Sequence, residues 1–344
     1  MIHYLVTRCL RRGTPRRLYP YSVGDVELRS AQSDMEQERE AIRQSLIAHG
    51  ETAVEPDVSA VRASTIVGAD NVGAAFTLAT LRIDEAIDVL ASANPMSTFS
   101  AYRLMEAGCT RDLATGEVMP LRPHIAPEHF NMWGSALLMD QYTWPARDFT
   151  QHVLSTERGE LGECYARAAH WSRKADLESN SHLAMLFEWF AAESIWNVAT
   201  NDDIISPIRW SLGFPNGKGI KVLGSATQQA INSDGMHSVW SGRIEDRLHR
   251  IRFLRNQTVH NGFRQVDVPA DELRWLRALS HLAARHALQC VEQGIRADLY
   301  STTDLIDYLP LLLEPGLHAT SKHVVERIQS ANTLISQLMQ PSVK

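Results

Sequence analysis

Residues 182–199 read HLAMLFEWFAAESIWNVA, a segment that is apolar nearly all round. A helix without a polar face is stable only when other elements surround it, so we expect this helix at the centre of a bundle. The preceding residues 179–181 (SNS) are of the kind that cap a helix N-terminus. Glu188 and Glu193 lie on this helix. A carboxylate in such surroundings needs either a partner or a route to solvent at the edge of the bundle.

The chain after about residue 150 is rich in amphipathic segments of helical period. Four further long helices are predicted, and they cover residues 157–178, 242–260, 271–293 and 321–339. Together with the central helix they are enough to form a bundle. We therefore expect residues 150–344 to form a helical bundle that ends in a C-terminal helix.

The first 125 residues have a different pattern, in which predicted strands are mixed with predicted helices. Strands are predicted at residues 3–10 and 25–30, and a hairpin is predicted at residues 107–119 around the Thr115-Gly116 turn. Amphipathic helices are predicted at residues 36–51 and 72–91. The expected fold is mainly α, with a smaller α+β N-terminal domain at residues 1–125. Residues 126–149, which contain two prolines and a glycine, are predicted to connect the two domains.

Composition indicates an ordinary globular protein with two domains. The chain has 344 residues, of which 44% are apolar and 22% are charged, and its net charge of −6 gives no overall attraction to nucleic acid. Its four cysteines are scattered without a CxxC pair, which argues against a disulfide framework or a structural zinc site. No apolar run reaches the roughly 18 residues that a membrane helix needs. We expect a cytoplasmic protein with no membrane segment.

Several familiar binding motifs are missing. The glycine-rich segment LGFPNGKGIKVLG (212–224) lacks the spacing of a Walker loop and the Ser or Thr that binds magnesium. The sequence also contains no HExxH, GxSxG or strand-linked GxGxxG motif. His124 and His129 have no third ligand nearby. The sequence therefore predicts neither a metal site nor a cofactor.

The segment RFLRNQTVHNG (252–262) carries the strongest chemical pattern in the chain, with Arg255, Asn256 and His260 at the end of a predicted helix. An arginine followed after four to six residues by a histidine occurs six times in this sequence, so the spacing alone identifies nothing. Context distinguishes this instance. Arg255 continues an apolar stripe, at helical spacing, that includes Ile244 and Leu248. A guanidinium at the end of a buried stripe requires an explanation.

A helical bundle with Arg-Asn-x-x-x-His at a helix end, a further helix after it and an acid on an earlier apolar helix resembles the HEPN superfamily. The AAESIW sequence around Glu193 is similar to the acidic helix of the Apea-like subset of that superfamily. The resemblance covers roughly residues 150–300. It implies that Arg255, Asn256 and His260 form an active motif with Glu193 as supporting acid, and Glu188 is the alternative acid.

Many HEPN proteins are metal-independent ribonucleases of prokaryotic conflict systems, and others are inactive. Two protomers of the family usually pair so that both motifs line one cleft. The resemblance therefore implies a homodimer and an endoribonuclease of a toxin or antiviral system. It says nothing about the N-terminal domain, which we expect to sense a trigger or to bind an activating or inhibitory protein.

The chemistry of these residue types suits RNA cleavage without a metal. His260 can exchange a proton near neutral pH, and the planar fork of Arg255 matches two phosphate oxygens. Asn256 can orient the phosphate or the imidazole, while Glu193 can hold Arg255. Residues 243–264 contain six arginines and two acids, which predicts a patch that binds the RNA backbone. The predicted RNA-binding side chains beside the site are those of Arg250, Arg252 and Arg264.

One geometric condition applies to this site. Five residues of an unbroken α-helix turn through about 500°, so Arg255 and His260 would point roughly 140° apart. The helix must therefore end or bend near His260, or a second copy must complete the site. The alternative interpretation is a noncatalytic HEPN-type module that binds RNA or nucleotide, or that serves only for dimerisation.

Overall fold

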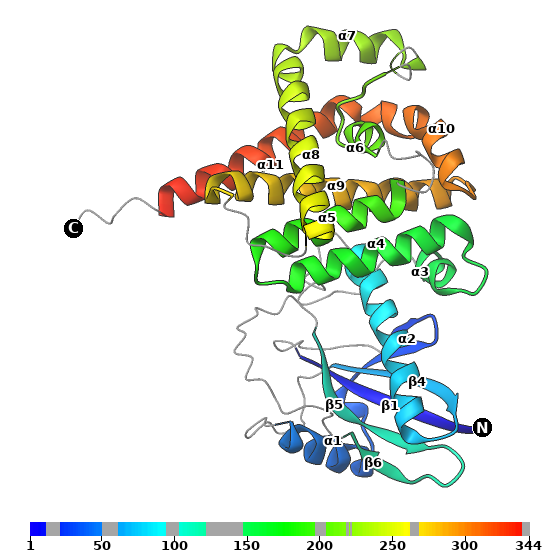
Figure 1. Cartoon of the computed structure of the whole chain (residues 1–344). Coiled ribbons are helices and arrows are strands. Elements are labelled where there is room, and N and C mark those ends of the chain that lie inside the picture. Colours follow the sequence, from blue (N-terminus) through cyan, green and yellow to red (C-terminus); the bar gives the residue numbers. More distant parts are fainter. Residues whose placement is uncertain are drawn as a thin grey trace. The chain divides into compact units, whose positions relative to one another are not determined.

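The computed structural model describes residues 1–11, 21–49, 61–93, 103–121, 147–196, 204–217, 220, 222–261 and 268–338. The chain divides into two compact units, Met1–Thr156 and Glu157–Lys344. The first combines a sheet with helices and the second is helical, so the expected mainly α fold with a smaller α+β N-terminal part is confirmed (Figure 1). Most of the predicted connection at residues 126–149 lies outside the described residues.

The first unit is built on an antiparallel sheet of six strands in the order β2-β3-β4-β1-β5-β6. The predicted strands and hairpin are present, and Gly116 in the hairpin turn adopts a φ of 76°. The strand next to β1, β4, was not predicted because its first five residues, VRAST, are buried on both faces and include polar side chains, so they lack the usual match between polarity and exposure. The strands are β1 (Ile2–Arg11), β2 (Tyr21–Val23), β3 (Val26–Ser30), β4 (Val61–Ala69), β5 (Arg103–Asp112) and β6 (Val118–Pro120).

Two helices cover opposite faces of this sheet. Side chains alternate between the faces of a strand, so neighbouring residues of β1 enter different cores. Leu10 packs with Ile87 of α2 (Val72–Ala93), whereas Cys9 packs with Ile42 of α1 (Glu36–Ala48). The short 3₁₀ turn Ala31–Ser33 precedes α1, and α3 (Arg147–Leu154) completes the unit.

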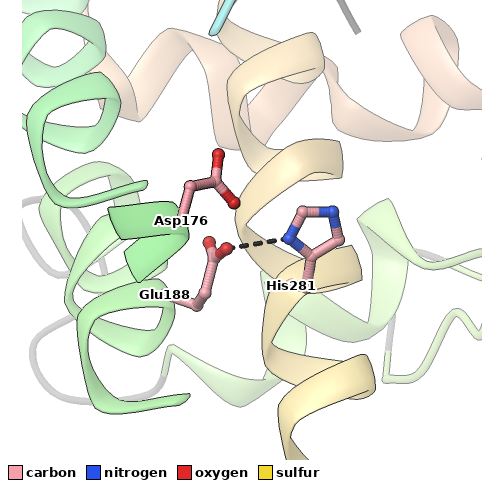
Figure 2. Close-up of side chains that lie close together, drawn as sticks. All are labelled: Asp176, Glu188 and His281. Carbon is pink, nitrogen blue, oxygen red and sulfur yellow. Dashed lines mark hydrogen bonds and ion pairs between the residues drawn. The ribbon is translucent and has the colours of Figure 1, made fainter. Parts of the chain in front are cut away.

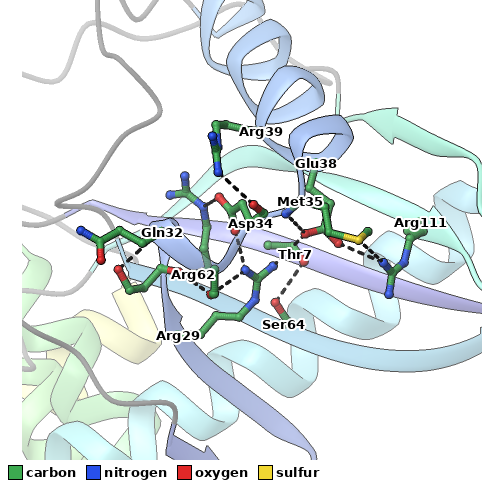
Figure 3. A network of polar contacts seen from close by, with 12 residues as sticks. Thr7, Arg29, Gln32, Asp34, Met35, Glu38, Arg39, Arg62, Ser64 and Arg111 are labelled. Carbon is green, nitrogen blue, oxygen red and sulfur yellow. Dashed lines mark hydrogen bonds and ion pairs between the residues drawn. The ribbon is translucent and has the colours of Figure 1, made fainter.

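A buried network of charged side chains fixes the junction between β3 and α1 (Figure 3). Asp34 accepts hydrogen bonds from the guanidinium groups of Arg29 and Arg62, which come from two adjacent strands. Glu38 pairs with Arg29 and with Arg111 of β5. Burying these charges is tolerated because each carboxylate meets more than one guanidinium.

The second unit is a helical bundle with α5 inside it. All but one of its buried side chains beyond the first turn are apolar or small, and α5 packs against α4, α8 and α9. Asn180 caps its N-terminus by accepting hydrogen bonds from the backbone N–H groups of His182 and Leu183. The long helices are α4 (Gly159–Leu177), α5 (Ser181–Trp196), α8 (Gly235–Asn261), α9 (Ala270–Arg296) and α11 (Leu317–Leu338).

Three shorter helices of this unit were not predicted. They are α6 (Ile205–Ser211), α7 (Ser225–Ser233) and α10 (Thr302–Leu313), and a 3₁₀ turn at Glu314–Gly316 follows α10. Helices α6 and α7 have only seven and nine residues, too few to show a clear helical period, and α10 contains Pro310, which in a sequence indicates a helix break. Gly213 follows α6 with a φ of 81°, and a Cβ there would lie 2.6 Å from backbone atoms of Leu317 and Ser321. This glycine is needed for the turn and for close packing against α11. In the described part of the chain, no helix has the length and apolarity required to cross a bilayer.

Candidate active site

Glu193 and Arg255 form the central ion pair of the candidate site. Nε and Nη2 of Arg255 donate hydrogen bonds of 3.1 Å and 2.9 Å to the same oxygen, Oε2, of Glu193. The two residues lie 62 positions apart in the sequence, on α8 and α5. The side chain of Arg255 is 27% exposed and that of Glu193 is 15% exposed, so solvent screens the pair only in part. The predicted contact between these two residues is present.

Three other side chains hold this pair in position. The indole Nε1 of Trp189 donates a 2.8 Å hydrogen bond to Oε1 of Glu193, which leaves Oε2 for the guanidinium. Nη1 of Arg255 donates to Oδ1 of Asn256 at 3.1 Å. The guanidinium carbon lies 5.9 Å from the centre of the Phe190 ring, within the range of a cation–π contact. These contacts occupy three of the five N–H groups of Arg255 and fix the plane of its fork.

The apolar stripe of α8 explains why Arg255 is directed toward α5. Ile244, Leu248 and Ile251 are fully buried, as their four- and three-residue spacing predicts. Arg255 is the next position on the same stripe and meets Glu193 where the buried surface reaches solvent. Helical spacing in the sequence thus identified the side of α8 that faces the bundle.

His260 lies apart from this pair in a single chain. The α8 helix continues without interruption to Asn261, so there is no bend between Arg255 and His260 that would turn the imidazole toward the guanidinium. The rise of an α-helix places the two residues roughly 7.5 Å apart along its axis and about 140° apart around it. The imidazole is exposed, and in the ranges that the structure describes it has no hydrogen-bond or ion-pair partner.

The arginine patch of α8 is less positive than its sequence indicates. Arg247 and Arg250 each place a nitrogen 3.1 Å from Oε1 of Glu272. Glu272 lies on α9, so the sum of charges along the α8 sequence does not include it. Arg252 is partly exposed, and among the described residues it has no charged partner. Arg264, the third predicted RNA-binding residue, lies outside the described residues.

Aromatic rings accompany the arginines of α8, which the sequence pattern did not reveal. Trp240 and Trp275 stack with a centroid distance of 6.3 Å and an interplanar angle of 4°. The guanidinium groups of Arg243 and Arg247 lie over these two rings. One of the two rings, that of Trp275, comes from α9, so inspection of the α8 sequence alone could not find the stack. Trp240 is only 5% exposed, so this arrangement holds the arginines of α8 against aromatic rings and does not present both rings to a ligand.

Glu188, the alternative acid, belongs to a different cluster. Its carboxylate is buried and lies 2.8 Å from Nδ1 of His281 on α9, with no contact to Arg255. Burial raises the pKa of Glu188, while the hydrogen bond from His281 acts in the opposite direction. Of the two acids on α5, only Glu193 contacts the predicted motif.

The described side chains around Arg255 form a site centred on a guanidinium that is paired with Glu193, and two exposed histidines, His249 and His260, lie on the same helix. Such a guanidinium can bind a phosphodiester, but within one chain His260 points away from it and cannot exchange a proton beside the bound phosphate. Comparison of the chain with protein-family models, with curated proteins and with solved structures found no match.

Proposed function

We propose that this protein is a metal-independent endoribonuclease that cleaves RNA by attack of the ribose 2′-hydroxyl on the adjacent phosphate. The observation that carries the proposal is the Glu193–Arg255–Asn256 arrangement. It holds a guanidinium in a fixed orientation beside solvent and, as far as the described residues go, leaves two of its N–H groups for a ligand. Two parallel N–H groups suit two phosphate oxygens.

Each residue has a distinct role in this proposal. Arg255 binds the scissile phosphate and stabilises the negative charge that grows in the transition state. His260 transfers a proton, either from the 2′-hydroxyl or to the leaving 5′-oxygen. Asn256 orients the phosphate, and Glu193 is a positioning residue that acts through Arg255. Arg250, Arg252 and Arg264 bind the flanking RNA backbone.

A homodimer is part of the proposal, because one chain directs Arg255 and His260 to different sides of α8. In a symmetric pair, His260 of one protomer can approach Arg255 of the other. Phe253 and Val259 support such a contact, since these apolar side chains are 49% and 53% exposed on α8 close to His260. The partner copy would cover them and complete the site.

The biological setting follows from the resemblance to HEPN proteins. We infer a cytoplasmic toxin or antiviral effector whose N-terminal unit binds a trigger or a controlling protein. The alternative function is a noncatalytic module that binds RNA or nucleotide, and it is favoured by the separation of His260 from Arg255 in one chain. Two experiments distinguish these functions.

The first experiment compares histidine variants on one helix. Purified protein is incubated with total RNA and with tRNA, and the new ends are mapped for a 2′,3′-cyclic phosphate. His260→Ala should abolish cleavage and leave RNA binding nearly intact, whereas His249→Ala, an exposed histidine of α8, should cleave normally. A chelator should have no effect, and a 2′-deoxy nucleotide at the cut position should block cleavage. Equal cleavage by the wild type and His260→Ala would contradict the proposal.

The second experiment tests whether two chains share the site. Arg255→Ala and His260→Ala are each inactive alone, but a mixed dimer retains one intact Arg255–His260 pair if the residues come from different chains. An equal mixture should then recover about a quarter of the wild-type activity, because half of the dimers carry one working site. No recovery, with mixed dimers demonstrated by mass spectrometry, would exclude a site shared in this way.

A further inference from the structure

A second cluster of ligating side chains lies within the bundle, away from Arg255. Asp176 at the end of α4, Glu188 on α5 and His281 on α9 direct their polar groups toward one another (Figure 2). One ligand atom from each residue can be chosen so that all lie within 4.8 Å of one another. In the described ranges, no other group of three or more His, Cys, Asp or Glu side chains has this geometry.

The charges in this cluster are incompletely matched. Glu188 is 3% exposed, and its Oε1 lies 2.8 Å from Nδ1 of His281. Among the described residues, the one hydrogen-bond partner of its second oxygen is the hydroxyl of Ser172, at the long distance of 3.4 Å. Asp176 forms an ion pair with Arg285 at 3.7 Å, a distance beyond hydrogen-bond range, so this guanidinium offsets part of the negative charge of the two carboxylates. A buried carboxylate oxygen without a close donor, next to a second carboxylate, is an unfavourable arrangement unless a cation joins it.

We propose that Asp176, Glu188 and His281 bind a divalent transition-metal ion of the Zn²⁺ type. The ligands are one imidazole nitrogen and two carboxylate oxygens, a mixed set that suits Zn²⁺ better than Mg²⁺, which prefers oxygen ligands alone. Ligands of a tetrahedral zinc ion lie roughly 3.4 Å apart, so separations of up to 4.8 Å must close by up to about 1.4 Å and the 2.8 Å contact between Glu188 and His281 must open slightly. Water completes the coordination.

The position of the three side chains allows an ion to enter from solvent and to link three helices. The side chains of His281 and Asp176 are 39% and 22% exposed, so an ion can enter from solvent, while Glu188 forms the buried floor of the site. Because the three ligands come from three helices, a bound ion joins the end of α4 to α5 and α9. Binding should therefore stabilise the bundle, since an ion that binds only the folded state shifts the unfolding equilibrium.

The test is a titration of the full chain, stripped with a chelator and desalted, with ZnCl₂ in a calorimeter. One equivalent should bind and the melting temperature should rise, whereas MgCl₂ should do neither. Asp176→Asn and His281→Gln should weaken zinc binding by more than the roughly 10- to 100-fold that loss of an outer-shell partner costs. His318→Gln removes a histidine from another acid–histidine pair, with Asp234, and should bind zinc like the wild type.

Two further measurements distinguish loss of the metal site from loss of the fold. Circular dichroism identifies any variant that fails to fold, and Asp176→Asn, at a partly exposed position, is the milder of the two changes. Co²⁺ should give a visible absorption band with the wild type and lose it with His281→Gln. Binding of equal strength in all variants, or no saturable binding by the wild type, would overturn the proposal. RNA cleavage is expected to be unaffected by the chelator. Failure to bind zinc would therefore leave the ribonuclease proposal standing, and absence of cleavage would leave the zinc-site proposal standing.

Discussion

The Glu193–Arg255 pair allows a quantitative test of how the candidate site is held together. Glu193→Gln keeps an oxygen for the Trp189 indole and removes the charge opposite Arg255. Glu193→Ala removes both and leaves the buried Nε1 of Trp189 without its acceptor. The two variants therefore separate the ion pair from the indole hydrogen bond.

The expected magnitudes follow from burial. Fully exposed ion pairs contribute about 0.2–1 kcal/mol, and hydrogen bonds to charged groups contribute about 1.5–3 kcal/mol. With side-chain exposures of 15% and 27%, the Glu193–Arg255 pair lies between these limits, and we expect a coupling energy of roughly 1–2 kcal/mol. Glu193→Ala should cost about 3 kcal/mol, since an unsatisfied buried donor adds roughly 1–3 kcal/mol.

Urea unfolding followed by tryptophan fluorescence measures these energies. Six of the eight tryptophans lie in the second unit, so the signal reports mainly on that unit. A double-mutant cycle with Glu193→Gln and Arg255→Gln gives the coupling energy directly. The same cycle at the more exposed Glu292–Arg296 pair of α9 should give less than about 0.5 kcal/mol.

The same variants connect the pair to the proposed activity. If Glu193 orients Arg255, then Glu193→Gln should lower kcat by on the order of 10- to 100-fold, because a small displacement of a catalytic group is costly. The KM for RNA should change less, since Arg252 and its neighbours still bind the backbone. A coupling energy below about 0.5 kcal/mol, or a wild-type kcat for Glu193→Gln, would refute the positioning role.

Three further predictions concern stability. Burial and two neighbouring histidines lower the pKa of His286 to about 4, so the unfolded chain takes up its proton first as the pH falls. The free energy of unfolding should therefore drop by up to about 2 kcal/mol between pH 6.5 and 5, and denaturation of His286→Gln should show a smaller drop. Gly213→Ala should cost about 2–4 kcal/mol, because a Cβ there combines a positive φ with close approach to the α11 backbone. Its control, Gly242→Ala in the open interior of α8, should stabilise by up to about 1 kcal/mol; equal melting temperatures for the two would contradict the steric argument. Asn180→Ala should cost about 1 kcal/mol through loss of the α5 cap, measured by urea unfolding, and an unchanged midpoint would exclude a capping role.

The sequence predicts those parts of the fold in which local period and burial agree. The long helices are recognisable because each has an apolar stripe that extends over several turns, as Ile244, Leu248 and Ile251 illustrate. The first five residues of strand β4 are buried on both faces and include polar side chains, so the strand was missed. Helices α6 and α7 were missed because a stripe of about two turns cannot be distinguished from chance, and α10 was missed because Pro310 interrupts its sequence.

The candidate site shows the same division between local and long-range information. Helical spacing directs Arg255 toward the bundle, and the apolar character of α5 requires a partner for its acids, so the pair with Glu193 could be expected from the sequence. The partners that come from α9 could not, because nothing in the α8 or α5 sequence indicates which helix will be adjacent. Glu272 reduces the charge of the arginine patch, and His281 takes Glu188 into a separate cluster.

The two acids of α5 illustrate how one helix can serve two sites. Glu188 and Glu193 are five residues apart, so they point roughly 140° away from each other and meet different neighbouring helices. Glu193 reaches α8 and orients a guanidinium, whereas Glu188 reaches α9 and faces an imidazole and a second carboxylate. The geometry that separates them is the same one that separates Arg255 from His260 on α8. In α5 this separation yields two clusters within one chain, and in α8 it makes the proposed reaction depend on a second chain.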